Sequence, residues 1–177
     1  MATNYTKQTW IDDNSSYPIS AARMGVIETG IYDAHYKAAV RAKNSAVIAV
    51  ATSTWTSLTF DGEDFDAQTM HSTSSNTGRL TAPVSGIYLV GANLQFAANT
   101  TGLRSVKLLQ NGVTEIGANS KAAAASGTTY LNLVTTVYLV SGNYVEVQAY
   151  QTSGGSLNVA YEAGNSPIFF AALLTAY

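Results

Sequence analysis

Four carboxylates lie close together in the chain, at Asp61, Glu63, Asp64 and Asp66, and they form its only dense cluster of charge. Calcium binds about six to eight oxygen atoms, to which such a cluster could contribute. The spacing is not that of a calcium-binding loop, and no glycine stands where that loop turns. The alternative is a solvated connection between two strands in which Asp61 and Asp66 cap turns. We favour this alternative, which leaves the four residues as weak metal candidates, and we predict no metal and no cofactor.

His71 follows this cluster and has serines and carboxylates near it, which are the residue types of a nucleophilic triad. Serine and aspartate are abundant in this chain, however, and no serine lies in a nucleophile-elbow motif. Paired carboxylates that cleave glycosidic bonds must face one another across a cleft, whereas these acids share one short segment. We therefore expect a packing role for His71 and predict that the protein is not an enzyme.

Aromatic side chains in or beside the expected strands could bind sugars if their rings stand clear of a sheet. Tyrosines that alternate along a strand, such as Tyr130 and Tyr138, are also typical of subunit interfaces, where a ring provides a large contact area and a polar tip. We favour the interface. The candidates for sugar binding are Trp55, Tyr130, Tyr144, Tyr150 and Tyr161.

The 177 residues are enough for one domain of ordinary size with a short appendage. Charged residues make up only 11% of the chain, against about 25% in a typical soluble domain, so a lone monomer would expose an unusually neutral surface. The net charge of -2 provides no basic surface for nucleic acid or for an anionic membrane. The absence of cysteine excludes disulfides and thiolate chemistry. We expect no signal peptide and no membrane span, because no sufficiently long apolar run occurs.

Residues 1–19 are polar and predict an extended arm that lies on another protein. The side chains expected to attach it are Tyr5, Trp10, Tyr17 and Ile19.

Ser20 is a suitable N-cap, and the spacing of the apolar residues after it predicts a helix from Ala21 to about Lys43. Its apolar residues step by three and four positions, as in the seam of a coiled coil, and isoleucine at both core positions favours three or more strands. The alternative is a helix that packs on its own domain. We divide the chain into an arm and helix at 1–44 and a β domain at 45–177. The seam consists of Met24, Ile27, Ile31, Ala34 and Ala38.

From Ala46 onward the apolar period changes to two and turn residues recur regularly, which predicts an all-β, antiparallel sandwich. Asn111-Gly112 is the strongest hairpin signal. The last strand is apolar on both faces, so the face turned away from the core needs a cover, and another subunit is the simplest one. The expected strands are Ala46–Thr52, Thr54–Phe60, Gly78–Ala82, Gly86–Ala97, Leu103–Gln110, Val113–Asn119, Thr129–Val140, Asn143–Thr152, Ser156–Glu162 and Pro167–Tyr177.

The low charge, the 11 tyrosines and the helical seam all indicate a closed homo-oligomer. Its expected interface consists of Met24, Ile27, Ile31, Tyr88, Tyr130, Tyr138, Phe169 and Phe170.

Three segments of the β domain resemble the tumour-necrosis-factor and complement globular-head superfamily. They are GIYLVGANLQF at 86–96, LVSGNYVEVQAYQT at 139–152 and SPIFFAALL at 166–174. The marks are a glycine-aromatic strand start after a Pro-x-x-Gly turn, a Gly-Asn-x-Val strand start, and an aromatic-rich last strand preceded by serine. The resemblance implies a mainly β, antiparallel jelly-roll sandwich that assembles as a homotrimer.

Two further segments resemble bacteriophage virion proteins. Residues 5–35 are similar to the N-terminal module of phage tail and head-fibre proteins, with its tryptophan-containing arm, Pro-Ile-Ser-Ala start and Glu-x-Gly-Ile helix. Residues 55–88 resemble the start of the jelly roll in such proteins, with FDGEDFD, MHS and RLTAP blocks. The resemblance implies a virion protein, which we expect to be a capsid decoration or head-fibre trimer bound to the major capsid protein or another virion protein. The alternative is a tail-associated protein that recognises a host-surface glycan or protein.

Overall fold

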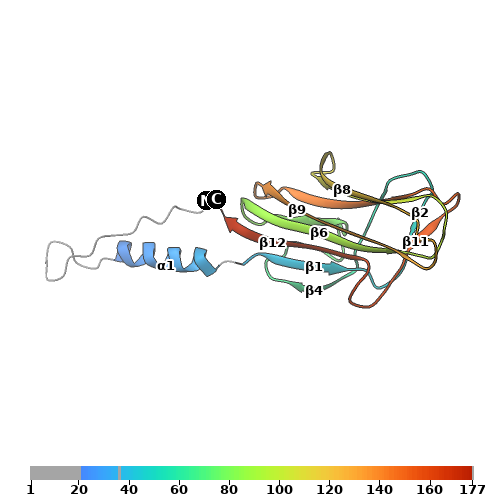
Figure 1. Cartoon of the computed structure of the whole chain (residues 1–177). Coiled ribbons are helices and arrows are strands. Elements are labelled where there is room, and N and C mark those ends of the chain that lie inside the picture. Colours follow the sequence, from blue (N-terminus) through green and yellow to red (C-terminus); the bar gives the residue numbers. More distant parts are fainter. Residues whose placement is uncertain (1–20, 36, 177) are drawn as a thin grey trace.

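The computed structural model describes residues 21–35 and 37–176. They form one helix followed by a two-layer antiparallel β-sandwich (Figure 1). This confirms the predicted fold class of a mainly β antiparallel sandwich with one helix. Within the described ranges, no helix is long and apolar enough to cross a membrane. The predicted arm residues Tyr5, Trp10, Tyr17 and Ile19 lie outside these ranges.

One layer is a seven-stranded sheet whose strand pairs are all antiparallel. Strand β9 (Thr129–Leu139) pairs with β6 in addition to the two neighbours that β6 has in the main order. That order is β2 (Ile48–Val50), β11 (Leu157–Val159), β6 (Gly86–Phe96), β12 (Ile168–Ala176), β1 (Ala39–Lys43) and β4 (Gly62–Asp66).

The other layer is a five-stranded antiparallel sheet. Its order is β3 (Thr56–Ser57), β10 (Tyr144–Gln151), β7 (Leu103–Gln110) and β8 (Thr114–Ala122), and β5 (Arg79–Thr81) also pairs with β10. The β7–β8 connection contains Asn111 and Gly112, both with positive φ, as the hairpin prediction requires.

Alternation along the strands explains the core. In β6 and β10 every second residue is buried, because the period of two sends one apolar row of each sheet into the space between the layers. Phe60 and Phe169 meet there with ring centroids 5.4 Å apart. All ten predicted strands are present, although several are shorter than predicted.

The helix α1 spans Ala21–His35, so the prediction that it continues to Lys43 is wrong. Residues 39–43 form β1 instead, because the alternate residues Val40 and Ala42 both point into the core and the backbone pairs with β12 and β4. Ala38, which was assigned to the helical seam, is also buried in the core. The β-sandwich therefore begins at Ala39, and the predicted domain boundary after residue 44 falls on the far side of its first strand.

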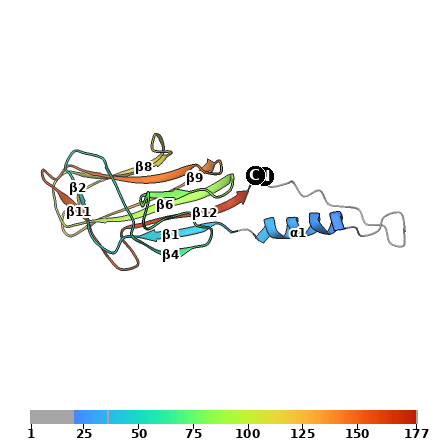
Figure 2. The same ribbon diagram turned by 180° about the vertical axis from the view of Figure 1, so that it is seen from behind.

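The helix lies off one end of the sandwich and does not pack on either sheet, as the two opposite views agree (Figures 1 and 2). Met24 and Ile31 are accordingly exposed. The arrangement differs from the alternative in which the helix packs on its own domain, and it leaves the apolar seam uncovered by the sandwich.

Two of the residues predicted for a subunit interface lie in the interior. Tyr88 and Phe169 are completely buried between the sheets, and the Tyr88 hydroxyl donates a hydrogen bond to the carbonyl oxygen of Val84 at 2.8 Å. Both point to the core side of their strands, so another chain cannot reach them. They are core residues.

Candidate functional site

The outer face of the seven-stranded sheet carries a broad apolar surface. Every second residue of β9, β6 and β12 points away from the core, and many of these side chains are large and apolar. Val134 is 53% exposed, Tyr138 52% and Leu174 56%. Large apolar side chains that are exposed together on one face mark an interaction site. We define the outer surface by nine residues of this face, among which the polar Asn93, Asn132 and Thr136 also lie. The nine are Tyr130, Val134, Tyr138, Ile87, Leu89, Gln95, Phe170, Ala172 and Leu174.

The centre of the outer surface is a row that crosses five strands. Gly91 of β6 pairs directly with Val134 of β9 on one side and with Phe170 of β12 on the other. Phe170 pairs with Arg41 of β1, which pairs in turn with the exposed Phe65 of β4. Since Gly91 has no side chain, the Phe170 ring lies over it and occupies the middle of the row.

One polar atom of the outer surface has no partner in the described chain. The Oε1 of Gln95 is buried and accepts no hydrogen bond. Gln95 pairs with the exposed Tyr130 in the β6–β9 ladder. A buried carbonyl oxygen without a donor costs about 1–3 kcal/mol.

Three of the predicted interface residues lie on the outer surface, namely Tyr130, Tyr138 and Phe170. Met24, Ile27 and Ile31 lie on α1, away from it. The alternation along β9 and β12 could also have indicated Val134 and Leu174, which were not predicted.

The four acidic residues do not gather around a common centre. Most of them lie in β4, an edge strand, rather than in a connection between strands as predicted, because residues 62–66 pair with β1. Asp64 binds Arg41 and, at 2.5 Å, Lys43. Within the described residues, no three carboxylate or histidine side chains lie together as metal ligands would.

Asp61 and Asp66 each hold a turn, as predicted. Asp61 accepts hydrogen bonds from the Oγ and N of Ser45, at 2.5 and 2.8 Å. Asp66 accepts from the backbone N–H groups of Met70 and His71, at 2.9 and 2.8 Å. The hydrogen bond from the Ser45 hydroxyl holds the pKa of Asp61 below its ordinary value, and the one from Lys43 does the same for Asp64. These contacts fix the edge of the sheet and leave the carboxylates engaged within the chain.

His71 has the packing role that we expected. Its side chain is fully buried against Phe60, with Nδ1 2.7 Å from the Glu63 carboxylate and Nε2 3.0 Å from the carbonyl oxygen of Thr77. Both ring nitrogens are therefore occupied by atoms of the chain. No substrate could reach either one.

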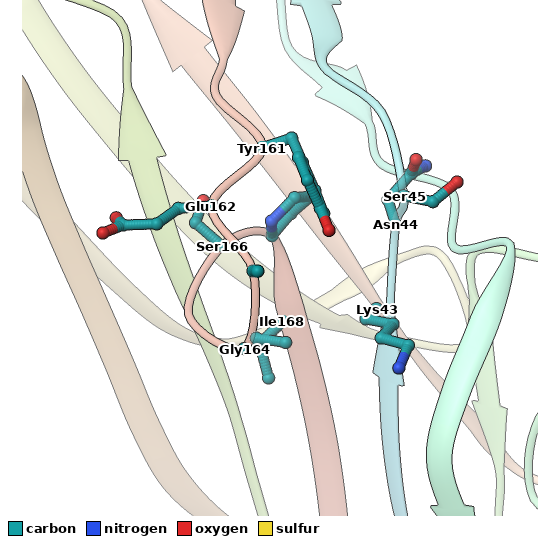
Figure 3. Close-up of a pocket in the computed structure, with 10 residues that line it drawn as sticks. Lys43, Asn44, Ser45, Tyr161, Glu162, Gly164, Ser166 and Ile168 are labelled. Atoms are coloured by element: carbon teal, nitrogen blue, oxygen red, sulfur yellow. The ribbon is translucent and has the colours of Figure 1, made fainter.

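A pocket of about 140 Å³ lies between the end of β1 and the loop before β12. Figure 3 shows the Tyr161 ring on one side and Lys43 and Asn44 on the other. Two of its polar side chains already have partners, because Asn44 donates to the carbonyl oxygen of Thr59 at 2.7 Å and Ser166 to that of Ala160 at 2.9 Å. The pocket offers no convergent set of free polar groups that would identify a ligand.

Comparison with known proteins agrees with the fold. No protein-family model matches the chain, and no curated protein sequence matches it either. Solved structures do match. The globular domain of zebrafish complement 1qA is 13% identical, with a TM-score of 0.58 over 79% of this chain and 99% of that chain. Eiger TNF from S. frugiperda is 13% identical, with a TM-score of 0.58 over 80% of this chain and 93% of that chain.

Murine APRIL gives a similar result, with 10% identity and a TM-score of 0.59 over 78% of this chain and 100% of that chain. The sandwich therefore has the fold of tumour-necrosis-factor and complement globular-head domains, as the resemblance of the three β segments implied. At this level of identity the likeness concerns the fold alone.

Proposed function

We propose that the chain is a structural, non-catalytic component of a bacteriophage virion that acts as a homotrimer. Self-association is supported by the outer surface, where Val134, Tyr138 and Leu174 are each more than half exposed. Covering this surface with a second copy removes apolar area from water. The jelly-roll resemblance supports three copies.

The helix supplies a second contact in this proposal. Met24 and Ile31 are exposed on α1, which lies apart from the sandwich. A helix of 15 residues is only marginally stable alone in water. Burial of Met24 and Ile31 against the helices of two neighbouring copies would stabilise it. Isoleucine at both core positions of the seam favours three strands over two.

The virion assignment is supported by the sequence resemblance of residues 5–35 and 55–88 to phage virion proteins. We propose that the N-terminal arm binds the major capsid protein or another virion protein, and that the jelly roll projects outward as a capsid decoration or head fibre. Three arms on one trimer multiply a weak contact through avidity. The low charge of the chain suits a passive coat protein without nucleic-acid partners.

A tail-associated receptor-binding protein is the second candidate. It is favoured by aromatic side chains on the outer face of the five-stranded sheet, where Trp55 and Tyr150 lie together. A trimer that buries the outer surface of the seven-stranded sheet would leave this face free for a host-surface glycan or protein.

The test is to locate the protein on intact phage particles with a labelled antibody and cryo-electron microscopy. Regular density on the capsid lattice is the expected result, and Trp10→Ala trimers should then no longer decorate capsids although they remain folded. Density at the tail end alone would favour the second candidate. Absence from purified particles would overturn the virion assignment, and full decoration by Trp10→Ala would overturn the role of the arm.

A further inference from the structure

The outer face of the five-stranded sheet carries a cluster of two aromatic rings and a cation. Trp55 precedes β3, Tyr150 lies on β10 and Lys107 lies on β7, so three adjacent strands bring them together. The Trp55 and Tyr150 ring centroids are 5.2 Å apart with an interplanar angle of 38°. The Nζ of Lys107 lies 4.3 Å from the centroid of a Trp55 ring. We call these three residues the aromatic platform.

The aromatic platform is open to solvent on the side of the molecule opposite the outer surface. Trp55 is 38% exposed, although an indole of this size is usually well covered in a folded protein. Around it the sheet is polar. The Nε2 of Gln148 donates to the Oγ of Ser57 at 3.1 Å, and the Oγ atoms of Ser105 and Ser120 lie 2.7 Å apart. Exposed hydroxyl groups beside an exposed indole, such as those of Ser57 and Ser120, fit a ligand that has both apolar C–H faces and hydroxyl groups.

The charge on the aromatic platform is not neutralised within the described chain. Lys107 forms no ion pair there, and its ammonium contacts only the Trp55 ring. The other cation of this face, Arg79, is bound to Glu146 at 2.8 Å and lies over the Tyr144 ring. The acidic residues of this face lie away from Lys107. Glu115 and Glu146 both flank Leu109, whereas Lys107 lies between Gln148 and Ala118. The aromatic platform is therefore the basic end of this face.

We propose that the aromatic platform binds a carboxylated sugar, as found in polyuronic or polysialic acid chains. The C–H face of the pyranose would lie on the exposed ring of Trp55 beside the half-buried ring of Tyr150, and its carboxylate would accept a charge-assisted hydrogen bond from Lys107. An uncharged sugar would lose that contact, and an acidic peptide would lack the flat C–H face. The inference goes beyond the structural role and holds for a capsid or a tail location.

The experiment uses the full chain with Trp10→Phe, which leaves Trp55 as the only indole, since the sequence has two tryptophans. Polygalacturonate, polysialate and neutral dextran are titrated in turn while tryptophan fluorescence is recorded. We expect a saturable change with at least one of the two acidic polymers and none with dextran. The acidic polymer that binds identifies the class of sugar. No response to either acidic polymer, or an equal response to dextran, would overturn the proposal.

Variants separate charge from folding. In this background Lys107→Gln should weaken binding about tenfold, as expected for one charge-assisted contact, whereas Lys107→Arg should retain it because a guanidinium also stacks on a ring. Lys121→Gln is the matched control, since Lys121 is exposed on β8 and touches neither ring. Circular dichroism of each variant checks that it is folded. Equal affinities for Lys107→Gln and Lys121→Gln would rule out the assigned role of Lys107.

Discussion

Phe170 lies across Gly91, its direct partner in the ladder between β6 and β12. A β-carbon at Gly91 would stand 2.5 Å from Cζ of Phe170 and 2.7 Å from the carbonyl oxygen of Leu133. Only glycine therefore fits at this position. The contact gives the outer surface its shape, because the Phe170 ring occupies the space above Gly91, next to Val134.

Gly91→Ala is expected to destabilise the fold. The new methyl group meets both the Phe170 ring and a backbone carbonyl, and the carbonyl cannot move away. Overpacking of this kind costs about 1–3 kcal/mol. Gly117→Ala is the control, since a β-carbon there would lie 3.5 Å or more from its neighbours, which is ordinary contact. Thermal unfolding followed by circular dichroism measures both. Equal midpoints for the two variants would show that the Gly91 site is not tight.

Arg104 anchors the loop between β6 and β7 although its guanidinium is completely buried. Nη1 donates to the carbonyl oxygens of Thr101 and Leu103, at 2.8 and 3.1 Å, and Nη2 to the backbone and side-chain oxygens of Asn99, at 3.0 and 3.1 Å. Nε has no partner, and burial lowers the pKa of the group below its ordinary value. The loop thus depends on hydrogen bonds from a buried cation.

Arg104→Ala should lower the free energy of unfolding by about 3 kcal/mol, because it leaves a cavity and removes four hydrogen bonds at once. Lys121→Ala, at the exposed position that pairs with Arg104 across the β7–β8 ladder, should change it by less than about 0.5 kcal/mol. Urea denaturation gives both values. A loss as small for Arg104→Ala as for the control would contradict the anchoring role.

The contact of Asp64 with Arg41 and Lys43 should make the edge of the sheet sensitive to acid. The hydrogen bond from Lys43, together with both positive charges, holds the pKa of Asp64 below its ordinary value of 3.8. The pKa of Asp64 is therefore lower in the folded than in the unfolded state. The stability that its ion pairs contribute is complete above about pH 3.8 and is lost as the pH falls through the lowered pKa.

Asp64→Asn should therefore melt below the wild-type protein at about pH 6, and this difference should vanish toward about pH 2. Glu115→Gln is the control, because Glu115 is exposed and forms no ion pair within the described residues. The measurement is the melting temperature of the three proteins across this pH range. A difference between wild type and Asp64→Asn that stays constant with pH would contradict the assignment.

The long strands could be predicted from sequence, but two elements of the seven-stranded sheet could not. The segment that includes β1 is rich in alanine and fits both a helical and an alternating period, so the helix was extended through it; Arg41, which interrupts the helical seam, was the available signal. Residues 62–66 were missed because three carboxylates and a glycine are poor strand formers. Such charges are tolerated in β4 because it is an edge strand.

The residues of the outer surface could be predicted only in part, because the sequence does not show which face of a strand is turned to the core. The period of two shows that neighbouring residues of a strand lie on opposite faces, and it placed Tyr88 and Phe169 correctly on faces distinct from those of Ile87 and Phe170. Which of the two faces is the interior depends on where the second sheet packs, and this information is not local. Tyr88 and Phe169 were therefore assigned to an interface although they belong to the core.

We propose that the chain forms a trimer through the outer surface, and the native mass, measured by light scattering after size exclusion, tests this. Three 18.6-kDa chains give about 56 kDa. Val134→Lys, which puts a charge at the centre of the outer surface, should yield folded 18.6-kDa monomers. Val113→Lys, at an 84% exposed turn position, should remain trimeric. A monomeric wild-type protein would show that the chain does not trimerise, and a Val134→Lys variant with unchanged mass would show that the trimer does not form through the outer surface.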